Sequence, residues 1–427
     1  MGIRKNRSSF LTNILTLFSG TVIAQALPIL LSPILSRMYS TQDFAVMAII
    51  TPIITIGATL STLRLDIAIV IPKKDDEARS LLSTALVFNL LIVFISLLGV
   101  VAAQLFWPTG SILSDSTKAL FWYIPVGIFA VGWYTTYNYW STRNKTYKNN
   151  AASKIVQAIV TILTSIVFGY FIPGAEGLIL GFVAGYVLGL LVLFMRQRRD
   201  VPLSLVTRYS KSESGQTICK YRNFIFVNTP NAVLNVAIDQ GLVYVLKIFF
   251  NNVIVGSFSF AYRYTKAPLS IIISSVGQVF YEEASKKANE GKDIRPLMFK
   301  IQKNLFLFSF PFFILGLIFA PEVFAFVFSD EYYQAGEIAA LLLPWIYINF
   351  LVSPISGITL IFNKQKEALL ISVADLTLRV GCIVAGAVLG DWELAFMLLG
   401  VVGAVSLIFA AWWYYSIADP EKTVRYQ

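Results

Sequence analysis

The 427 residues of this chain are 56% hydrophobic and only 14% charged, and the mean hydropathy is +0.69. This composition excludes an ordinary soluble domain and indicates a protein whose solvent is lipid. The formal charge of +10 does not indicate nucleic-acid binding, because the basic residues lie in the breaks between apolar runs and form no single patch. With no histidine in the sequence, any proton step would need a carboxylate.

The apolar runs are long enough to cross about 30 Å of hydrocarbon, and a spanning segment must satisfy its own backbone, so we expect helices. The sequence predicts about twelve of them, near 11–36, 43–71, 80–106, 119–140, 152–172, 177–195, 225–250, 253–283, 304–328, 337–362, 367–389 and 393–417. Residues 24–26 resemble a signal-peptidase site, but the apolar run continues through Leu35, so we expect a retained first helix.

The basic residues also predict the orientation of these helices. Most of the 34 Lys and Arg residues fall in alternate connections, and short cytoplasmic loops are the ones enriched in Lys and Arg. The two chain ends belong to this basic set. We therefore expect an even number of helices, with the N-terminus and the C-terminus both on the cytoplasmic side.

The longest break between apolar runs divides the chain into halves. We predict an N-terminal lobe over 1–195, a cytoplasmic linker over 196–224 and a C-terminal lobe over 225–427. Each half would begin inside the cell, so the two would be related by an axis along the membrane normal. Such pseudo-symmetric halves are typical of alternating-access transporters.

Seven ionisable residues lie well inside predicted helices. At roughly 3 kcal/mol each, seven uncompensated charges would cost about 20 kcal/mol, so most of them should face a wet cavity or one another. Such residues are the candidates for function. They are Arg64, Asp66, Asp239, Arg263, Lys266, Asp375 and Arg379.

The basic members of this set indicate an anion site. Arg263 and Lys266 are three residues apart on one helix, so they share a face and cannot neutralise each other. Arg64 occupies a comparable place in the first half of the chain. We expect these three residues to line the seam between the halves, where transporters of this kind bind their substrate.

The acidic members leave several interpretations open. Asp66 is two residues from Arg64, a spacing that points the side chains apart, so it needs another partner or water. Asp239 either pairs with a cation of the neighbouring helix or carries a proton.

The last pair has a local interpretation. Asp375 and Arg379 are four residues apart with the acid first, which favours an ion pair within one helix. The other reading is that Arg379 contributes its charge to the cavity.

The sequence gives no sign of a catalytic or metal site. Cys219 and Cys382 match no zinc, redox or disulfide spacing, and we find no Gly-rich phosphate loop, serine elbow or acidic metal cluster. We therefore expect no metal, no cofactor and no ATP-driven step in this chain.

Three stretches resemble Wzx-type oligosaccharide flippases of the multidrug, oligosaccharidyl-lipid and polysaccharide (MOP) exporter superfamily, and the likeness covers nearly the whole chain. They are 64–73, RLDIAIVIPK; 261–285, from AYR to the alanine and serine after GQVF; and 328–345, which begins FSDEYYQAG. Relatives commonly have glycine where this chain has Ser329, a departure that concerns the geometry of a turn.

The resemblance implies an all-helical integral membrane protein with two six-helix lobes arranged as a V around a cationic cavity. It implies no enzymatic activity, a location in the bacterial cytoplasmic (inner) membrane, and membrane lipids as neighbours. The implied substrate is an oligosaccharide, such as an O-antigen repeat unit, on a polyprenyl diphosphate, and a polysaccharide polymerase of the same pathway is a further expected partner. Arg64, Arg263, Lys266 and Arg379 would hold the diphosphate, since arginine binds phosphate bidentately.

Two other functions fit parts of the sequence. A cation-coupled multidrug exporter of the same fold would favour an acidic or aromatic cavity. A polytopic polymerase or glycosyltransferase would need catalytic residues on a large outer loop, and the longest outer connection, 107–118, holds one acid and one base. A scaffold without transport would not need charges at membrane depth.

Overall fold

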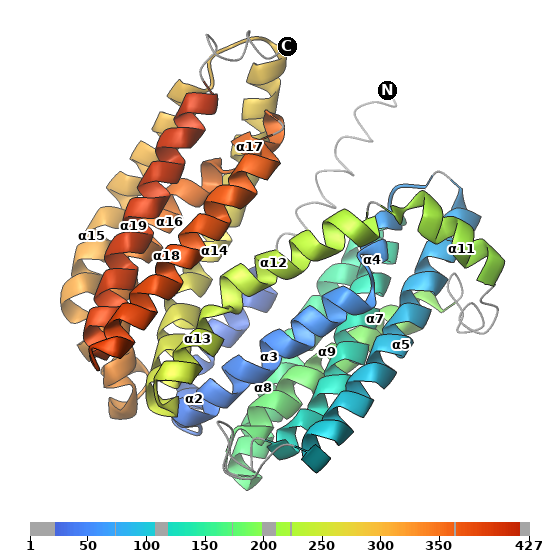
Figure 1. Ribbon diagram of the computed structural model, residues 1–427, viewed down its shortest axis with the longest axis horizontal. Helices are drawn as coiled ribbons and strands as arrows, with labels where there is room; N and C mark the ends of the chain where they lie inside the picture. Colours follow the sequence, from blue (N-terminus) through green and yellow to red (C-terminus); the bar gives the residue numbers. More distant parts are fainter. Residues whose placement is uncertain are drawn as a thin grey trace. The chain divides into compact units, whose positions relative to one another are not determined.

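The structure is a computed structural model that describes residues 22–72, 74–106, 118–172, 174–198, 211–222, 224–362 and 364–418. All regular structure in these ranges is helical. The helices form two compact units, Met1–Gly241 and Leu242–Gln427. Both units consist of helices (Figure 1).

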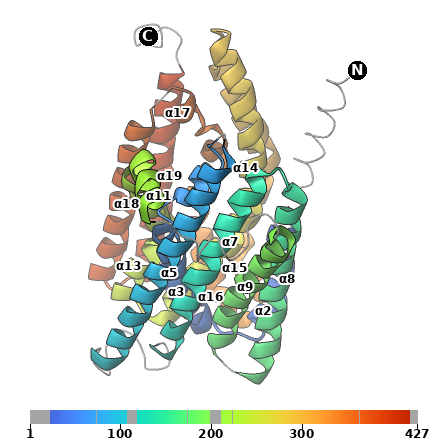
Figure 2. The same cartoon turned by 90° about the vertical axis from the view of Figure 1, so that its right-hand side faces the viewer.

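The first unit is a bundle of long helices with shorter pieces on its edges. Its most extensive helix packing is between α8 and α9, which run side by side in both views (Figures 1 and 2). Its elements are α2 (Ser32–Ser36), α3 (Thr41–Ser61), α4 (Leu65–Ala68), α5 (Asp75–Phe106), η1 (Leu120–Trp122), α7 (Tyr123–Arg143), α8 (Tyr147–Phe171), α9 (Glu176–Gln197), α11 (Lys211–Lys220), η2 (Phe224–Asn228) and α12 (Thr229–Gln240).

Small and polar residues bring the helices of the first unit together. Gly181 and Gly185 lie against α8, where an added Cβ would come within 2.1 Å of Ser165 Oγ and 2.0 Å of Thr161 Oγ1, respectively. The buried amide of Asn89 on α5 donates to Ser61 Oγ on α3 at 2.6 Å and to the Ile128 carbonyl on α7 at 3.1 Å. Close approach of small residues and polar bonds between helices are the usual means of association in a membrane.

The second unit is formed by long helices joined by short turns. They are α13 (Leu242–Phe249), α14 (Asn252–Asn289), α15 (Arg295–Val327), η3 (Asp330–Tyr332), α16 (Tyr333–Val352), η4 (Ser353–Ile355), α17 (Ile358–Ile361), α18 (Gln365–Val388) and α19 (Trp392–Ile417). Helices α16 and α19 pack tightly, because a Cβ on Gly400 would come within 2.0 Å of the Leu341 carbonyl oxygen. Helix α14 also packs on α16, and it has few contacts with α15.

Each of the twelve predicted segments is largely helical where the structure describes it; the first is described only from residue 22. Within the described ranges, eight helices are long and apolar enough to cross a membrane alone, and a ninth is gained if the segments on either side of Gly241 count as one span. The prediction of an all-helical integral membrane fold is therefore confirmed. The orientation of the chain ends and the V arrangement stay predictions.

The predicted helices over 43–71, 225–250 and 337–362 are broken in the structure; the last passes from α16 through η4 and a turn at 356–357 to α17. The helix expected over 43–71 ends at Ser61 and resumes at Leu65, because Leu63 and Arg64 adopt φ angles of 49° and 55° in the left-handed region. The helix expected over 225–250 is interrupted at Gly241, which is also where the two compact units divide.

The predicted linker over 196–224 holds a short helix, α11, that belongs to the first unit. The Lys220 ammonium pairs with the Glu77 carboxylate at the start of α5, and the Tyr221 hydroxyl donates to the same carboxylate at 2.9 Å. The hydroxyls of Ser80 and Thr217 lie 2.8 Å apart. Residues 225–241, which we assigned to the C-terminal lobe, therefore cluster with the first unit, and the lobe boundaries as functional divisions stay a prediction.

Candidate functional site

Two cationic residues and two aromatic residues come together in the second unit. On α14, Lys266 Nζ donates to Tyr262 Oη at 2.7 Å and lies 4.7 Å from the centre of that ring. These residues are four apart on one helix, so their side chains share a face. The Tyr262 ring stacks on Trp345 of α16, with 5.3 Å between ring centres and 14° between planes.

The other face of this arrangement is formed by α18. Arg379 Cζ lies 4.4 Å from the centre of the Trp345 ring, and the guanidinium forms an ion pair with the Asp375 carboxylate. The Ser406 hydroxyl on α19 donates to the same carboxylate. The intrahelical pair that the spacing of Asp375 and Arg379 favoured is thus present, and both side chains are buried.

We call Tyr262, Lys266, Trp345, Asp375 and Arg379 the cation–aromatic cluster. It holds two formal positive charges and one negative charge on three helices. Lys266 is about 21 Å from the start of α14, and Arg379 is about 21 Å from the start of α18, at about 1.5 Å of rise per residue. On the predicted arrangement of the helices in the membrane, both distances place the cluster inside a hydrocarbon core of about 30 Å.

Burying charge at this depth is costly unless partners offset it. Desolvated cations interact more strongly with aromatic faces than exposed ones do, by about 2 kcal/mol or more against about 0.5–1 kcal/mol. The rings of Tyr262 and Trp345, together with Asp375, supply that compensation in the structure. The excess of one positive charge in this group fits an anion better than a cation.

Arg263 lies beside this cluster on α14. Its guanidinium carbon is 5.8 Å from the centre of the Tyr264 ring, and its side chain is exposed, whereas Lys266 is half-buried. The two residues that the sequence put on one face therefore lie against different tyrosines. Asp239 lies in α12, and its side chain is outside the described part of the chain, so its expected pairing stays a prediction.

In the first unit, Arg64 stands at the break between α3 and α4. Its φ of 55° is left-handed, a conformation that is uncommon for residues other than glycine. The Nε atom is buried and has no hydrogen-bond partner among the described residues. Burial of an unsatisfied donor costs about 1–3 kcal/mol, which is often a feature of a functional position.

The surroundings of Arg64 hold the break in place. Asp66 is buried and accepts from Thr62 Oγ1 at 3.2 Å, which is the other partner that the sequence required of it. Leu65 and Ile69 are fully buried in the aromatic core formed with α5, α7 and α9. Beyond the C-terminal end of α4, Arg143 Nη1 donates to the Ile69 carbonyl at 3.1 Å.

Sequence reasoning missed the aromatic members of the cluster. Tyr262 and Trp345 are 83 positions apart and are two of many aromatic residues in apolar helices. The one available signal was the spacing of Tyr262 and Lys266, which are four residues apart on the same helix face. The contact with Arg379 depends on how α14, α16 and α18 pack.

Solved structures with the same fold are membrane transporters and a flippase, not enzymes. The lipid II flippase MurJ in an inward closed conformation gives a TM-score of 0.70 at 15% identity, with 94% of this chain and 87% of that chain covered. An inward-facing multidrug resistance transporter of the MATE family, in the MOP superfamily, gives 0.66 at 16% identity, with 94% and 96% covered. A MOP superfamily transporter from Pyrococcus furiosus gives 0.62 at 15% identity, with 96% of each chain covered.

These matches define the class: the chain is a multi-pass membrane protein with the fold of MOP superfamily transporters. A family model described as polysaccharide biosynthesis protein matches residues 34–337. The chain therefore belongs to the polysaccharide biosynthesis protein family, in agreement with the resemblance to Wzx-type flippases. No curated protein matches it.

Proposed function

We propose that this protein is a flippase that moves oligosaccharide repeat units, carried on polyprenyl diphosphate, from the cytoplasmic to the outer leaflet of the bacterial inner membrane. Transport occurs by alternating access, in which the substrate site opens first to one side of the membrane and then to the other. No covalent bond is made or broken. The repeat units feed the synthesis of a surface polysaccharide. A polysaccharide polymerase of the same pathway then uses the translocated units.

The observation that supports this proposal most directly is the cation–aromatic cluster. A diphosphate that crosses the bilayer needs positive charge at mid-depth, and Lys266 and Arg379 carry that charge on aromatic supports. Membership of the polysaccharide biosynthesis family favours a glycan as cargo.

Arg64 and Arg263 would add further donors for the same diphosphate. A guanidinium binds phosphate oxygens through two parallel N–H groups, which gives orientation as well as affinity. The buried Nε of Arg64 would gain an acceptor when the phosphate arrives. Under this proposal, Asp375 holds Arg379 in place between transport cycles and releases part of its hold when the substrate anion competes for the guanidinium.

Complementation tests the proposal. The gene for this chain is expressed in bacterial strains that each lack one glycan flippase, and surface polysaccharide is measured. We expect one strain to regain its polysaccharide. If no polysaccharide returns in any of the strains, although the protein is present in the membrane, the proposal is wrong.

Variants of Lys266 then test the part played by the cluster. Lys266→Gln removes the charge and should lower polysaccharide export about tenfold or more, because a charge-assisted bond contributes about 1.5–3 kcal/mol. Lys266→Arg should retain most of the export. Lys247→Gln is the matched control, because Lys247 bonds to Asn252 at the other end of the short turn between α13 and α14, away from the cluster.

The second candidate function is a cation-coupled multidrug exporter. Its support is the likeness to a multidrug MATE transporter and a cavity of about 600 Å³ in the second unit, lined mainly by aromatic and aliphatic side chains. Cavities of about 300–1,000 Å³ with such a lining hold drug-sized ligands. Drug resistance on overexpression, without any return of polysaccharide in the complementation strains, would favour this function over the flippase.

A further inference from the structure

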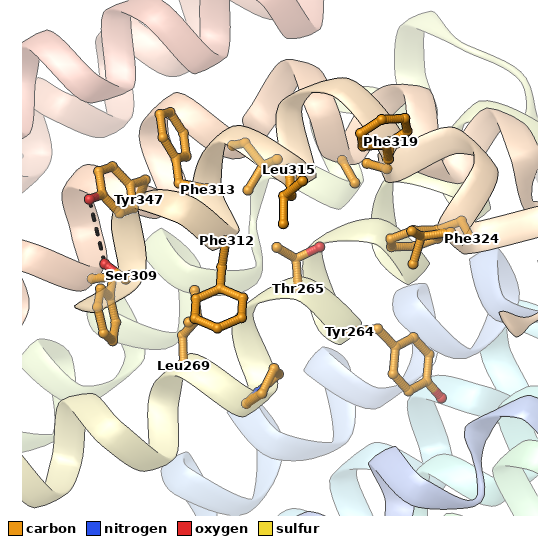
Figure 3. Close-up of a pocket in the computed structure, with 17 residues that line it drawn as sticks. Tyr264, Thr265, Leu269, Ser309, Phe312, Phe313, Leu315, Phe319, Phe324 and Tyr347 are labelled. Atoms are coloured by element: carbon orange, nitrogen blue, oxygen red, sulfur yellow. Dashed lines mark hydrogen bonds between the residues drawn. The ribbon is translucent and has the colours of Figure 1, made fainter. Parts of the chain in front are cut away.

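The cavity of about 600 Å³ lies between α14, α15 and α16, and all of its lining belongs to the second unit (Figure 3). Tyr264, Thr265 and Leu269 line it from α14, and Phe312 and Phe313 line it from α15. The gap exists because α14 packs on α16 and has few contacts with α15.

The cavity is long and runs along α15. Its lining begins at Ser309 and extends to Phe324, and these positions are about 22 Å apart along the helix axis. This length is most of the thickness of a hydrocarbon core of about 30 Å. The shape is that of a track parallel to the helices and suits a chain-like ligand better than a compact one.

The walls of the track are almost wholly apolar. Ser309 Oγ and Tyr347 Oη lie 3.5 Å apart, the same tyrosine hydroxyl donates to the Phe306 carbonyl at 3.4 Å, and Thr265 adds a further hydroxyl to the lining (Figure 3). The track therefore offers few of the polar groups that a sugar or a drug cation would need. A hydrocarbon chain suits it.

One side of the track adjoins a positive charge of α14. Tyr264 lines the track, and the Arg263 guanidinium lies 5.8 Å from the centre of its ring. Two residues further along the same helix, Lys266 belongs to the cation–aromatic cluster. Lys266 and Tyr262 project from a different face of α14 from the residues that line the track, so Arg263 is the cation that adjoins it. An apolar track beside a cation matches a lipid that has an anionic head and a long tail.

The depth of those cations separates two lipid sources. The phosphate of a resident phospholipid lies in the headgroup layer, outside the hydrocarbon core. Arg263 and Lys266 are about 17–21 Å from the start of α14, well inside that core. A lipid whose phosphate lies there is one that is being carried across.

We propose that the track between α14, α15 and α16 binds the polyprenyl tail of the lipid carrier while its diphosphate lies at Arg263. This inference rests on the proposed function and adds to it the site of the tail. The tail stays in an apolar environment along α15 throughout the cycle. Only the diphosphate and the glycan then need a polar route across the membrane. Aromatic side chains along the track face the flat double bonds of the isoprene units.

Photocrosslinking tests the track on the full-length protein in detergent. A benzophenone amino acid replaces Leu315, which lines the track and is 53% exposed, or Ile318, which does not line it and is 59% exposed. The probe is a radiolabelled polyprenyl diphosphate without sugar. We expect a labelled adduct at position 315 that is at least about fivefold stronger than at 318 and is displaced by unlabelled polyprenyl diphosphate but not by phosphatidylglycerol.

Equal labelling at 315 and 318, or equal displacement by phosphatidylglycerol, would overturn the proposal. A blocking variant gives the second measurement. Val323→Trp places a tryptophan in the track, and Ile318→Trp places the same side chain outside it. We expect Val323→Trp to lose adduct formation and polysaccharide export, whereas Ile318→Trp keeps both.

The two proposals fail separately in these tests. Specific labelling at 315 in a protein that complements no strain would leave the track as a polyprenyl site and reject the glycan flippase. Complementation by a protein that shows no specific labelling would keep the flippase and reject the track.

Discussion

The guanidinium of Arg379 lies over the indole of Trp345, 4.4 Å from the centre of the ring, while Asp375 pairs with it from the same helix. Trp345 is itself buried and stacks on Tyr262, which receives the Lys266 ammonium. The indole therefore separates two cations that would otherwise repel each other at membrane depth. Its flat surface is what allows both to be present.

Replacement of Trp345 should therefore weaken export more than it weakens folding. Trp345→Leu removes the ring under Arg379, and a desolvated cation–aromatic contact contributes about 2 kcal/mol, so we expect polysaccharide export to fall about tenfold or more. Trp345→Phe should lose less, because a smaller ring remains. The measurement is surface polysaccharide normalised to the amount of protein in the membrane, and equal export by both variants would contradict the role of the ring.

The ion pair of Asp375 and Arg379 predicts an asymmetry between single and double variants. Arg379→Gln leaves the buried Asp375 carboxylate uncompensated, so the protein should lose about 3–5 kcal/mol of stability. Asp375→Asn with Arg379→Gln removes both charges and should regain most of that loss. Thermal unfolding in detergent measures the difference. If the double variant folds well but does not export glycan, the cation has a role in transport as well as in folding.

The backbone at Arg64 allows charge and conformation to be tested separately. Asparagine tolerates a left-handed φ, so Arg64→Asn should fold normally and lose export, because only the cation is removed. Arg64→Val places a branched side chain in the same conformation and should be less stable than Arg64→Asn by about 1–2 kcal/mol. The comparison uses unfolding temperature for stability and polysaccharide for export. Full export by Arg64→Asn would remove Arg64 from the substrate site.

The turn between α15 and η3 carries backbone strain at Ser329, whose φ of 156° and ψ of 167° belong to a region that is essentially limited to glycine. Ser329→Gly should therefore stabilise the protein, by about 1–3 kcal/mol. Ser329→Ala keeps a Cβ and should give no such gain. Unfolding temperatures of the two variants decide the matter, and equal values would show that the turn is not strained.

The fold was largely predictable from sequence because each spanning helix carries its own apolar run. The same local reasoning predicted the pair of Asp375 and Arg379, and the departure from glycine at Ser329 pointed to an unusual turn geometry. The break at Leu63 and Arg64 was not predictable, since neither residue is a helix breaker and the break is held by tertiary packing of α4. The cation–aromatic cluster was missed for a similar reason: it forms only when three helices that are distant in the sequence pack together.

Translocation by the purified protein tests the central claim most directly. The protein is reconstituted into liposomes that contain a fluorescent glycan on polyprenyl diphosphate, and the fraction that an added membrane-impermeant quencher can reach is followed over time. The account predicts that the inner-leaflet half of the fluorescent lipid becomes accessible with the wild-type protein, that it does so at least about tenfold more slowly with Lys266→Gln, and that it stays protected in protein-free liposomes. Equal rates for wild type, Lys266→Gln and protein-free liposomes would contradict it.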